Sequence, residues 1–378
     1  MKKYFLAVAS FFIYSHISLG QVYPGQMDST FVPVRSHHYD PELTFDFCVN
    51  EPAWSNQAGI HSAFGSTDRL YFRKEVPVNH DNDLSSSYST TVWRGERANA
   101  QILVWSSEAL EQVRVSTQDL RSAEGNIIPK DRITFELVRY VLSNYPYAEK
   151  KAICGESPYK SGFLMPDRFE TLDRFDLPSQ TTRPVWMMVD VPRGTVPGTY
   201  KGQVEVRAKG KAPQLLNLEI VVQNQLLPYP KDWKYRLDLW QNPWAVAWYN
   251  HVEPWSPEHK MLLKQHLKHY ADAGGTYITT YGVHSPWSDN SYMIEGGMIE
   301  WIKKADGTWA FDYKIFDEYV ELAMECGIDE AITLYTPIPW GFRHRYKDEA
   351  TGDYSYINWA PSSKEFKKMW NIFLTDFK

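Results

Sequence analysis

The pattern of apolar residues changes at one place in the chain, and that change most constrains the fold. Before residue 228, apolar and polar residues mostly alternate and are interrupted by Gly and Pro, as in Thr199–Lys209. Alternation with a period of two predicts strands. After residue 234, short apolar runs alternate with segments in which apolar residues recur every three or four positions, which predicts helices. Residues 228–234 contain Pro228 and Pro230 and are predicted to be a short, stiff linker.

Residues 41–227 are predicted to form an N-terminal β-sandwich. Many short strands separated by turn residues, with almost no helical periodicity, are typical of that architecture. The expected strands are residues 44–49, 69–76, 91–105, 113–117, 133–142, 183–191, 199–209 and 215–222. Residues 192–198, with the sequence PRGTVPG, are predicted to turn the chain back as a hairpin. Residues 154–180 are expected to cross the surface in an extended conformation.

Residues 235–378 are predicted to contain three strand–helix units in succession. The expected strands are residues 235–239, 277–283 and 332–339, and the expected helices follow Ser256, span 312–326 and span 364–377. Two insertions are expected, a hairpin over 298–311 and a polar, aromatic segment over 341–361. This order favours a (β/α)8 barrel over an open sheet. A complete barrel takes about 250 residues, so we expect an incomplete, truncated one, with a small open sheet as the alternative.

The N-terminus is predicted to be a signal peptide. Lys2 and Lys3 precede a mostly apolar stretch over 4–14, and Ser18–Gly20 supplies small residues, so cleavage is expected before Gln21. Residues 21–40 are expected to be a polar leader. The apolar stretch is too short for a stable membrane anchor. The sequence therefore predicts an exported protein, periplasmic or extracellular, without membrane insertion.

The composition of the chain limits which classes of partner are expected. A net charge of −6 gives no reason to expect nucleic acid as a partner. The 15 Trp and 24 Tyr residues indicate either two large cores or rings that face a ligand, and sugars stack on such rings. Cys48, Cys154 and Cys326 have no metal-site spacing, and neither a metal nor a cofactor is predicted. A disulfide between Cys48 and Cys154 is one possibility, and the oligomeric state is left open.

In barrels, the ligand lies at the C-terminal ends of the strands. Applied to the three expected strands, this rule selects six candidate sugar-binding residues, although any single ring could instead cap the core. They are Trp240 and Gln241 after the first strand, His284 and Trp287 after the second, and Tyr335 and Trp340 after the third.

Four acidic residues are candidate catalysts. The adjacent Asp329 and Glu330 follow Gly327 and precede the third strand. That position is the N-terminal end of the strand, so a solvated turn is favoured over an acid/base pair. Asp238 and Asp289 each lack a paired carboxylate at a spacing that predicts glycoside cleavage.

Three stretches together resemble glycoside hydrolase family 123. They are VDVPRGTVPGTYKGQVEV at 189–206, LDLWQNPW at 237–244 and GIDEAITLYTPIPW at 327–340. The resemblance implies a secreted bacterial enzyme with an N-terminal β-sandwich and a C-terminal (β/α)8 barrel. It also implies β-N-acetylgalactosaminidase activity by a substrate-assisted, retaining mechanism. In that mechanism the substrate's acetamido oxygen attacks the anomeric carbon, an Asp orients the acetamide, and the adjoining Glu is the general acid/base.

The chain departs from the family pattern at the catalytic pair. In the family, the Asp-Glu pair lies at the C-terminal end of a later barrel strand, whereas Asp329 and Glu330 precede theirs. The true pair is therefore expected beyond Lys378. We expect a truncated, inactive form of a hydrolase for terminal β-linked N-acetylgalactosamine, or N-acetylhexosamine more broadly. A non-catalytic, secreted glycan-binding protein is the alternative.

Overall fold

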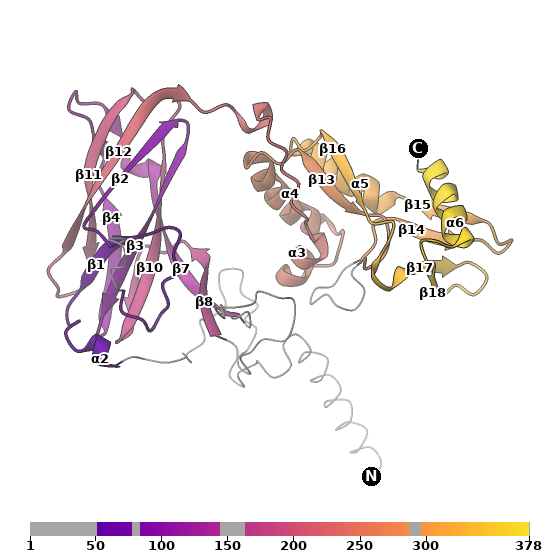
Figure 1. The fold of residues 1–378 in the computed structure, drawn as a ribbon, viewed down its shortest axis with the longest axis horizontal. Helices are drawn as coiled ribbons and strands as arrows, with labels where there is room; N and C mark the ends of the chain where they lie inside the picture. The colour runs from indigo at the N-terminus through magenta and orange to yellow at the C-terminus, as the bar shows by residue number, and fades with distance from the viewer. Residues whose placement is uncertain (1–50, 78–83, 144–162, 287–295, 378) are drawn as a thin grey trace, which may run out of the picture. The chain divides into compact units, whose positions relative to one another are not determined.

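A computed structural model describes residues 51–77, 84–143, 163–286 and 296–377. The chain divides into two compact units, residues 1–227 and 228–378 (Figure 1). The signal peptide, the leader, the expected strand at 44–49 and both Cys48 and Cys154 lie outside the described residues.

The first unit is built from two sheets that share one hydrophobic core. The five-stranded sheet has the order β1 (His61–Gly65), β3 (Arg97–Ser106), β10 (Thr181–Asp190), β7 (Ile133–Ser143) and β8 (Phe163–Glu170). The other sheet has the order β2 (Ser87–Arg94), β12 (Gln214–Leu226), β11 (Gly198–Arg207), β4 (Leu110–Thr117) and β9 (Phe175–Leu177), with β5 (Leu120–Arg121) and β6 (Ile127–Ile128) beside it. The short elements α2 (Glu51–Trp54) and η1 (Lys130–Arg132) complete the unit. Ile102 and Met187 from one sheet and Val204 and Ile220 from the other are fully buried in one cluster. This β-rich unit agrees with the predicted sandwich.

The hairpin predicted at residues 192–198 is wrong. β10, before this segment, pairs with β3 and β7, whereas β11, after it, pairs with β12 and β4. The segment therefore passes the chain from one sheet to the other. Alternating residues identify the face of a strand that is buried, but they do not identify its partner. Both kinds of connection use the same Gly and Pro turn residues.

The strand predicted at residues 69–76 is also wrong, because this stretch consists of turns. Tyr71 and Arg73 are buried there, which explains the alternating pattern. Single contacts hold their backbone instead of a sheet ladder: the Tyr140 hydroxyl donates to the Tyr71 carbonyl at 2.9 Å, and the Thr182 amide donates to the Arg73 carbonyl at 2.8 Å. In contrast, β8 and β9 form within the segment that was predicted to be an extended crossing.

The second unit contains two parallel strands, β13 (Tyr277–Tyr281) and β16 (Ala331–Tyr335). The helices of this unit are α3 (Pro243–Asn250), α4 (Pro257–Asp272), α5 (Lys314–Glu325) and α6 (Lys364–Asp376), with the short turns η2 (Pro230–Asp232) and η4 (Trp340–Phe342). Ser256 caps α4 by accepting from the His259 amide at 3.2 Å, and Ser363 caps α6 by accepting from the Phe366 amide at 3.1 Å. The second and third predicted strands and all three predicted helices therefore form.

The first predicted strand of this unit is not a regular strand. Residues 235–239 make one parallel bridge, between Leu237 and Gly275, and Tyr235 is 65% exposed. A side chain holds the segment beside the sheet instead, because the Asp238 carboxylate accepts from the Thr279 and Thr333 hydroxyls at 2.9 Å each. With two regular parallel strands in the described residues, the incomplete (β/α)8 barrel stays a prediction.

The residues that follow this segment begin a helix that was not predicted. Asn242 is the N-cap of α3, accepts from the Ala245 amide at 3.2 Å, and is followed by Pro243 at the first helical position. Trp244 is buried, with its ring edge-on to Tyr281 at a centroid distance of 5.2 Å. Only the residues before the cap remain available at the surface.

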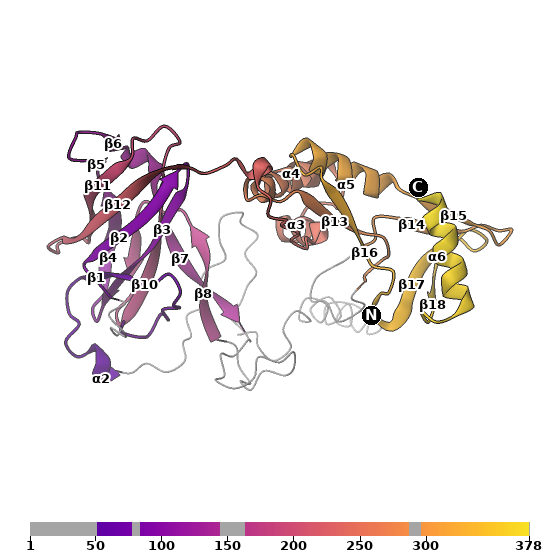
Figure 2. The same cartoon turned by 45° about the horizontal axis from the view of Figure 1, so that its top comes forward.

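The two insertions of the second unit combine into a four-stranded sheet. Its order is β15 (Trp309–Asp312), β14 (Glu300–Lys303), β17 (Arg343–Asp348) and β18 (Tyr354–Asn358). The β14–β15 hairpin agrees with the prediction, whereas β17 and β18 form within the polar, aromatic segment at 341–361, for which no strands are predicted. α6 lies along this sheet (Figure 2), and the Phe373 ring stacks on the Trp301 ring at 4.9 Å.

We predict that removing the Phe373 ring destabilises the second unit far more than removing the side chain of its exposed neighbour, Leu374. Phe373 is 0% exposed, so Phe373→Ala should lower the free energy of unfolding by about 3–5 kcal/mol. Leu374 is 48% exposed, so Leu374→Ala should cost no more than about 0.5 kcal/mol. Urea unfolding followed by tryptophan fluorescence measures both. Equal losses in the two variants would contradict this packing.

Candidate functional site

The C-terminal ends of β13 and β16 lie at the same edge of the parallel sheet. The Gly282 amide, just after β13, donates to the Tyr335 carbonyl at 2.7 Å and ties the two ends together. The Tyr335 ring lies against the Trp240 ring at a centroid distance of 5.1 Å and an interplanar angle of 49°. Trp240 is 62% exposed. The structure therefore brings two of the predicted site residues together as an accessible aromatic pair.

Trp340 is held at the same edge by the backbone. Its amide donates to the Pro286 carbonyl at 2.8 Å, which links the loop after β16 to the loop after β13. The Trp340 ring is 52% exposed. Trp287, the other ring predicted for this edge, lies outside the described residues.

His284 follows β13 and is partly buried beside Arg345 of β17. Nη1 of Arg345 lies 3.3 Å from Nε2 of His284. A guanidinium can only donate, so Nε2 accepts and the proton of the neutral ring is on Nδ1. Burial, followed by the charges of Arg345 and Arg343, lowers the pKa of His284 to about 4. The ring is therefore uncharged at neutral pH and carries one N–H donor.

Gln241 is fixed through its main chain. Its carbonyl accepts from the buried Tyr281 hydroxyl at 2.6 Å. The residue also borders a hollow of about 420 Å³. That hollow is lined by Leu239, Trp240, Gln241, Asn242, Pro243, Val246, Leu263, His266, His269, Tyr270 and Ala273. Most of this lining is apolar, and Trp240 and Gln241 connect it with the strand ends.

The prediction from sequence missed two arginine–tyrosine pairs next to His284. Arg343 lies over the Tyr356 ring with its guanidinium carbon 3.8 Å from the centroid, and Arg345 lies over the Tyr354 ring at 4.2 Å. The arginines come from β17 and the tyrosines from β18. The sequence does contain a signal for this strand, because basic residues alternate with His and Tyr over residues 343–347. Such alternation is typical of a half-buried strand.

Asp329 and Glu330 lie at the opposite end of β16. The Glu330 carboxylate accepts from the Thr276 hydroxyl at 2.9 Å and from the Tyr277 hydroxyl at 3.2 Å, and so joins the starts of the two parallel strands. The position agrees with the turn predicted from sequence.

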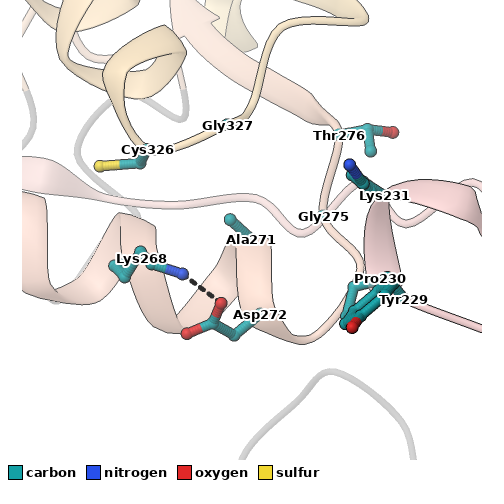
Figure 3. A pocket seen from close by; sticks show the side chains of 10 residues that line it. All are labelled: Tyr229, Pro230, Lys231, Lys268, Ala271, Asp272, Gly275, Thr276, Cys326 and Gly327. Carbon is teal, nitrogen blue, oxygen red and sulfur yellow. Dashed lines mark hydrogen bonds and ion pairs between the residues drawn. The ribbon is translucent and has the colours of Figure 1, made fainter.

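A second hollow lies at this same N-terminal end and has a volume of about 330 Å³ (Figure 3). It is lined by Tyr229, Pro230, Lys231, Lys268, Ala271, Asp272, Gly275, Thr276, Cys326 and Gly327. Lys268 and Asp272 point toward one another and form an ion pair within it. Because Gly275 and Thr276 precede β13, this hollow is at the other end of the strands from His284.

No group of three or more His, Cys, Asp or Glu side chains in the described part of the chain could hold a metal ion. Among the helices of that part, none has the length and apolar character needed to span a membrane.

Comparisons with known proteins match both units. Residues 64–208 match the glycoside hydrolase 123 N-terminal domain, and residues 240–378 match the glycoside hydrolase 123 catalytic domain. A solved family 123 glycoside hydrolase from Clostridium perfringens, described for glycolipid glycan hydrolysis, is 25% identical with a TM-score of 0.74. The match covers 85% of this chain and 55% of that one. The chain therefore belongs to glycoside hydrolase family 123, and it spans about half the length of that relative.

Other solved structures match weakly. A PapD-like domain of human CEP192 is 12% identical with a TM-score of 0.23, covering 49% of this chain and 99% of that one. A xyloglucanase from Bacteroides ovatus is 8% identical with a TM-score of 0.19, and the match covers 65% of this chain and 43% of that one. Neither likeness bears on fold or function. Among the curated proteins there is no match.

We predict that Arg345 helps to hold His284 in its neutral form. NMR titration should give His284 a pKa of about 4, and Arg345→Gln should raise that pKa toward the ordinary value without reaching it, because burial remains. Lys347→Gln, an exposed change on the same strand, should leave it near 4.

The same shift predicts how stability depends on pH. The folded pKa lies below the unfolded value of about 6.5, so the unfolded chain binds the proton first as pH falls. The contribution of His284 to stability is therefore complete above pH 6.5 or so and is lost progressively toward pH 4 or so. A His284 pKa near 6.5 in the folded protein, or an unchanged pKa in Arg345→Gln, would refute this account.

Proposed function

We propose that the chain represents an exported glycoside hydrolase that acts on β-linked N-acetylgalactosamine by a substrate-assisted, retaining mechanism. Membership of family 123 supports the reaction class. The residues 1–20 pattern supports export. The observation that carries the proposal is the set of exposed rings at one edge of the parallel sheet, with the Trp240–Tyr335 pair and Trp340 held there by the loops after the strands.

These rings are suited to a sugar. A pyranose presents an apolar C–H face that packs on an aromatic ring, and its hydroxyls need polar partners at the edges. Trp240 and Trp340 are each more than half exposed. Each therefore presents a large apolar surface to solvent, on which a sugar could pack. Gln241 borders the same rings and carries an amide that can pair with sugar hydroxyls. The arrangement supports sugar binding at this edge.

In the proposed reaction the substrate supplies its own nucleophile. The acetamido oxygen attacks the anomeric carbon while the bond to the leaving oxygen breaks and a Glu carboxylic acid gives that oxygen its proton. The neighbouring Asp polarises the acetamide. Water then attacks the anomeric carbon of the resulting oxazolinium ring and loses its proton to the same Glu, and the two displacements together retain the configuration. The mechanism is an exception to the scheme with two enzymic carboxylates and uses no cofactor.

The chain contains three Asp-Glu sequences, and none is placed for this role. Glu330 joins the starts of β13 and β16 through Thr276 and Tyr277. Glu318 on α5 pairs with Lys260 at 3.2 Å, and Glu349 pairs with Lys304 at 2.9 Å. A general acid needs a raised pKa, whereas hydrogen bonds from Lys314 and then Lys260 lower the pKa of Glu318. The hydrogen bond from Lys304 likewise lowers the pKa of Glu349. We therefore propose that the catalytic pair lies beyond Lys378.

We predict that the chain binds N-acetylgalactosaminides through its exposed strand-end rings. Trp340→Ala should weaken binding of methyl β-N-acetylgalactosaminide about tenfold, because a stacking surface is lost. Trp248→Ala removes an equally exposed ring that belongs to α3 and not to a loop after a strand, and it should leave the affinity unchanged. Calorimetric titration measures both. Equal effects of the two substitutions would argue against a site at this edge.

We predict no turnover of a chromogenic β-N-acetylgalactosaminide by the 378-residue chain, because Glu330 is placed to hold two strands together. Activity is measured by release of the chromophore, with Glu330→Gln as the matched variant. Clear turnover that disappears in Glu330→Gln would overturn the assignment of the catalytic pair.

A non-catalytic glycan-binding protein is the second candidate, and the same exposed rings favour it. Both candidates predict binding by this chain. The reading frame beyond the Lys378 codon separates them, because the hydrolase requires an Asp-Glu pair at the end of a further strand and the binding protein does not.

A further inference from the structure

The four-stranded sheet has one face covered by α6 and another that carries charge. Along β17, His344 and Tyr346 are buried, and Trp370 of α6 lies 6.2 Å from the His344 ring. Successive strand residues point to opposite faces, so Arg343 and Arg345 lie on the face away from α6. We call the set of Arg343, Arg345, Tyr354 and Tyr356 the arginine–tyrosine face.

This face is pre-arranged by its own contacts. Each guanidinium lies over a tyrosine ring from the neighbouring strand, and this cation–π contact sets its orientation. The Tyr354 hydroxyl donates to Oε2 of Glu300 at 2.9 Å, which fixes that ring. Both tyrosines remain about half exposed, at 50% for Tyr354 and 48% for Tyr356. The face therefore offers cationic groups beside accessible aromatic surface.

Arg345 is the most informative member of this face. Its side chain is 21% exposed, and its nearest carboxylate oxygen, Oε2 of Glu300, is 3.8 Å away and already accepts from Tyr354. Nη1 contacts the neutral His284. Nε is buried and has no hydrogen-bond partner among the described residues. A largely buried guanidinium with so weak an ion pair favours an added anion.

The face adjoins the strand-end rings. The contact between Arg345 and His284, which follows β13 directly, brings the arginine–tyrosine face next to the edge where Trp340 and the Trp240–Tyr335 pair lie. A glycan whose terminal sugar occupies that edge would continue over the sheet.

We propose that the arginine–tyrosine face binds a carboxylate-bearing sugar of the uronic acid type, in the same glycan as the N-acetylgalactosamine residue. This inference rests on the proposed function and specifies its substrate class. The guanidinium fork matches the two oxygens of a planar carboxylate, whereas a hydroxyl of a neutral sugar gains no such charge-assisted pair. The tyrosine rings pack on the C–H face of the same sugar.

The test is a titration of the intact chain with two matched tetrasaccharides. One is unsulfated chondroitin, in which N-acetylgalactosamine alternates with glucuronic acid and occupies the non-reducing end. The other is its carboxyl-reduced counterpart, with glucose in place of glucuronic acid. The acidic probe should bind about ten times more tightly than the neutral one. This difference in affinity should shrink as salt is added.

Substitutions test whether the arginine–tyrosine face causes the preference for the acidic probe. Arg345→Gln should abolish the difference between the probes, and Arg345→Lys, which keeps the charge but loses the fork, should remove most of it. Arg343→Gln should reduce it. Lys368→Gln, which removes a charge from the exposed side of α6, should leave it intact. Circular dichroism confirms that each variant is folded, and Arg343→Gln serves as the test if Arg345→Gln does not fold.

The outcomes separate this inference from the proposed function. Equal binding of both probes would overturn the carboxylate assignment and leave the proposed function standing, whereas binding of neither would overturn both. A preference that persists in both arginine variants would overturn the location. A carboxyl-reduced, 4-sulfated probe that binds as tightly as the acidic one would replace carboxylate recognition with recognition of any oxyanion.

Discussion

The buried indole of Trp301 joins the parts of the second unit that form the candidate site. Its ring, on β14, stacks on Phe373 of α6 and lies 5.0 Å from the Phe311 ring of β15. Its Nε1–H donates to the Gly282 carbonyl at 2.8 Å, directly after β13. A buried indole N–H needs a partner, so the four-stranded sheet cannot shift relative to the strand end without leaving that group unpaired. The contact between Arg345 and His284 depends on this fixed spacing.

Polarity and charge are divided between the two sheets at this site. The parallel sheet contributes rings and a histidine that is neutral at pH 7, because burial and the neighbouring guanidiniums disfavour its protonation. The four-stranded sheet contributes the cationic guanidinium groups of Arg343 and Arg345, both on β17. The neutral ring of His284 can therefore accept from the Arg345 guanidinium and connect the two sheets.

The sequence predicted those features of the second unit that depend on nearby residues. Ser256 before Pro257 marks the start of α4, and the turn around Gly307 marks the β14–β15 hairpin. The rule that ligands lie at strand ends selected Trp240, Tyr335 and Trp340, which the fold brings to one edge.

The prediction from sequence missed features that depend on contacts between residues far apart in the chain. β10 and β11 look like a hairpin locally but pair in different sheets. Residues 235–239 have the alternation of a strand, yet their main contacts are the hydrogen bonds from the Asp238 carboxylate. Arg345 was not selected because its relevance comes from a contact with a residue 61 positions away. Sequence periodicity specifies buried faces, whereas pairing and side-chain contacts across the fold require the tertiary structure.

The surroundings of the three Asp-Glu sequences explain why binding and catalysis are assigned to different segments. A carboxylic acid that protonates a leaving group works best when a poorly solvated site raises its pKa. Lysine partners at Glu318 and Glu349 have the opposite effect, and Glu330 is committed to two hydroxyls at the wrong end of its strand. In contrast, the rings around Tyr335 would displace water from a bound sugar. Contacts with sugars away from the cleaved bond can then orient the acetamide for attack, so an extended recognition surface such as the arginine–tyrosine face would contribute to the rate as well as to affinity.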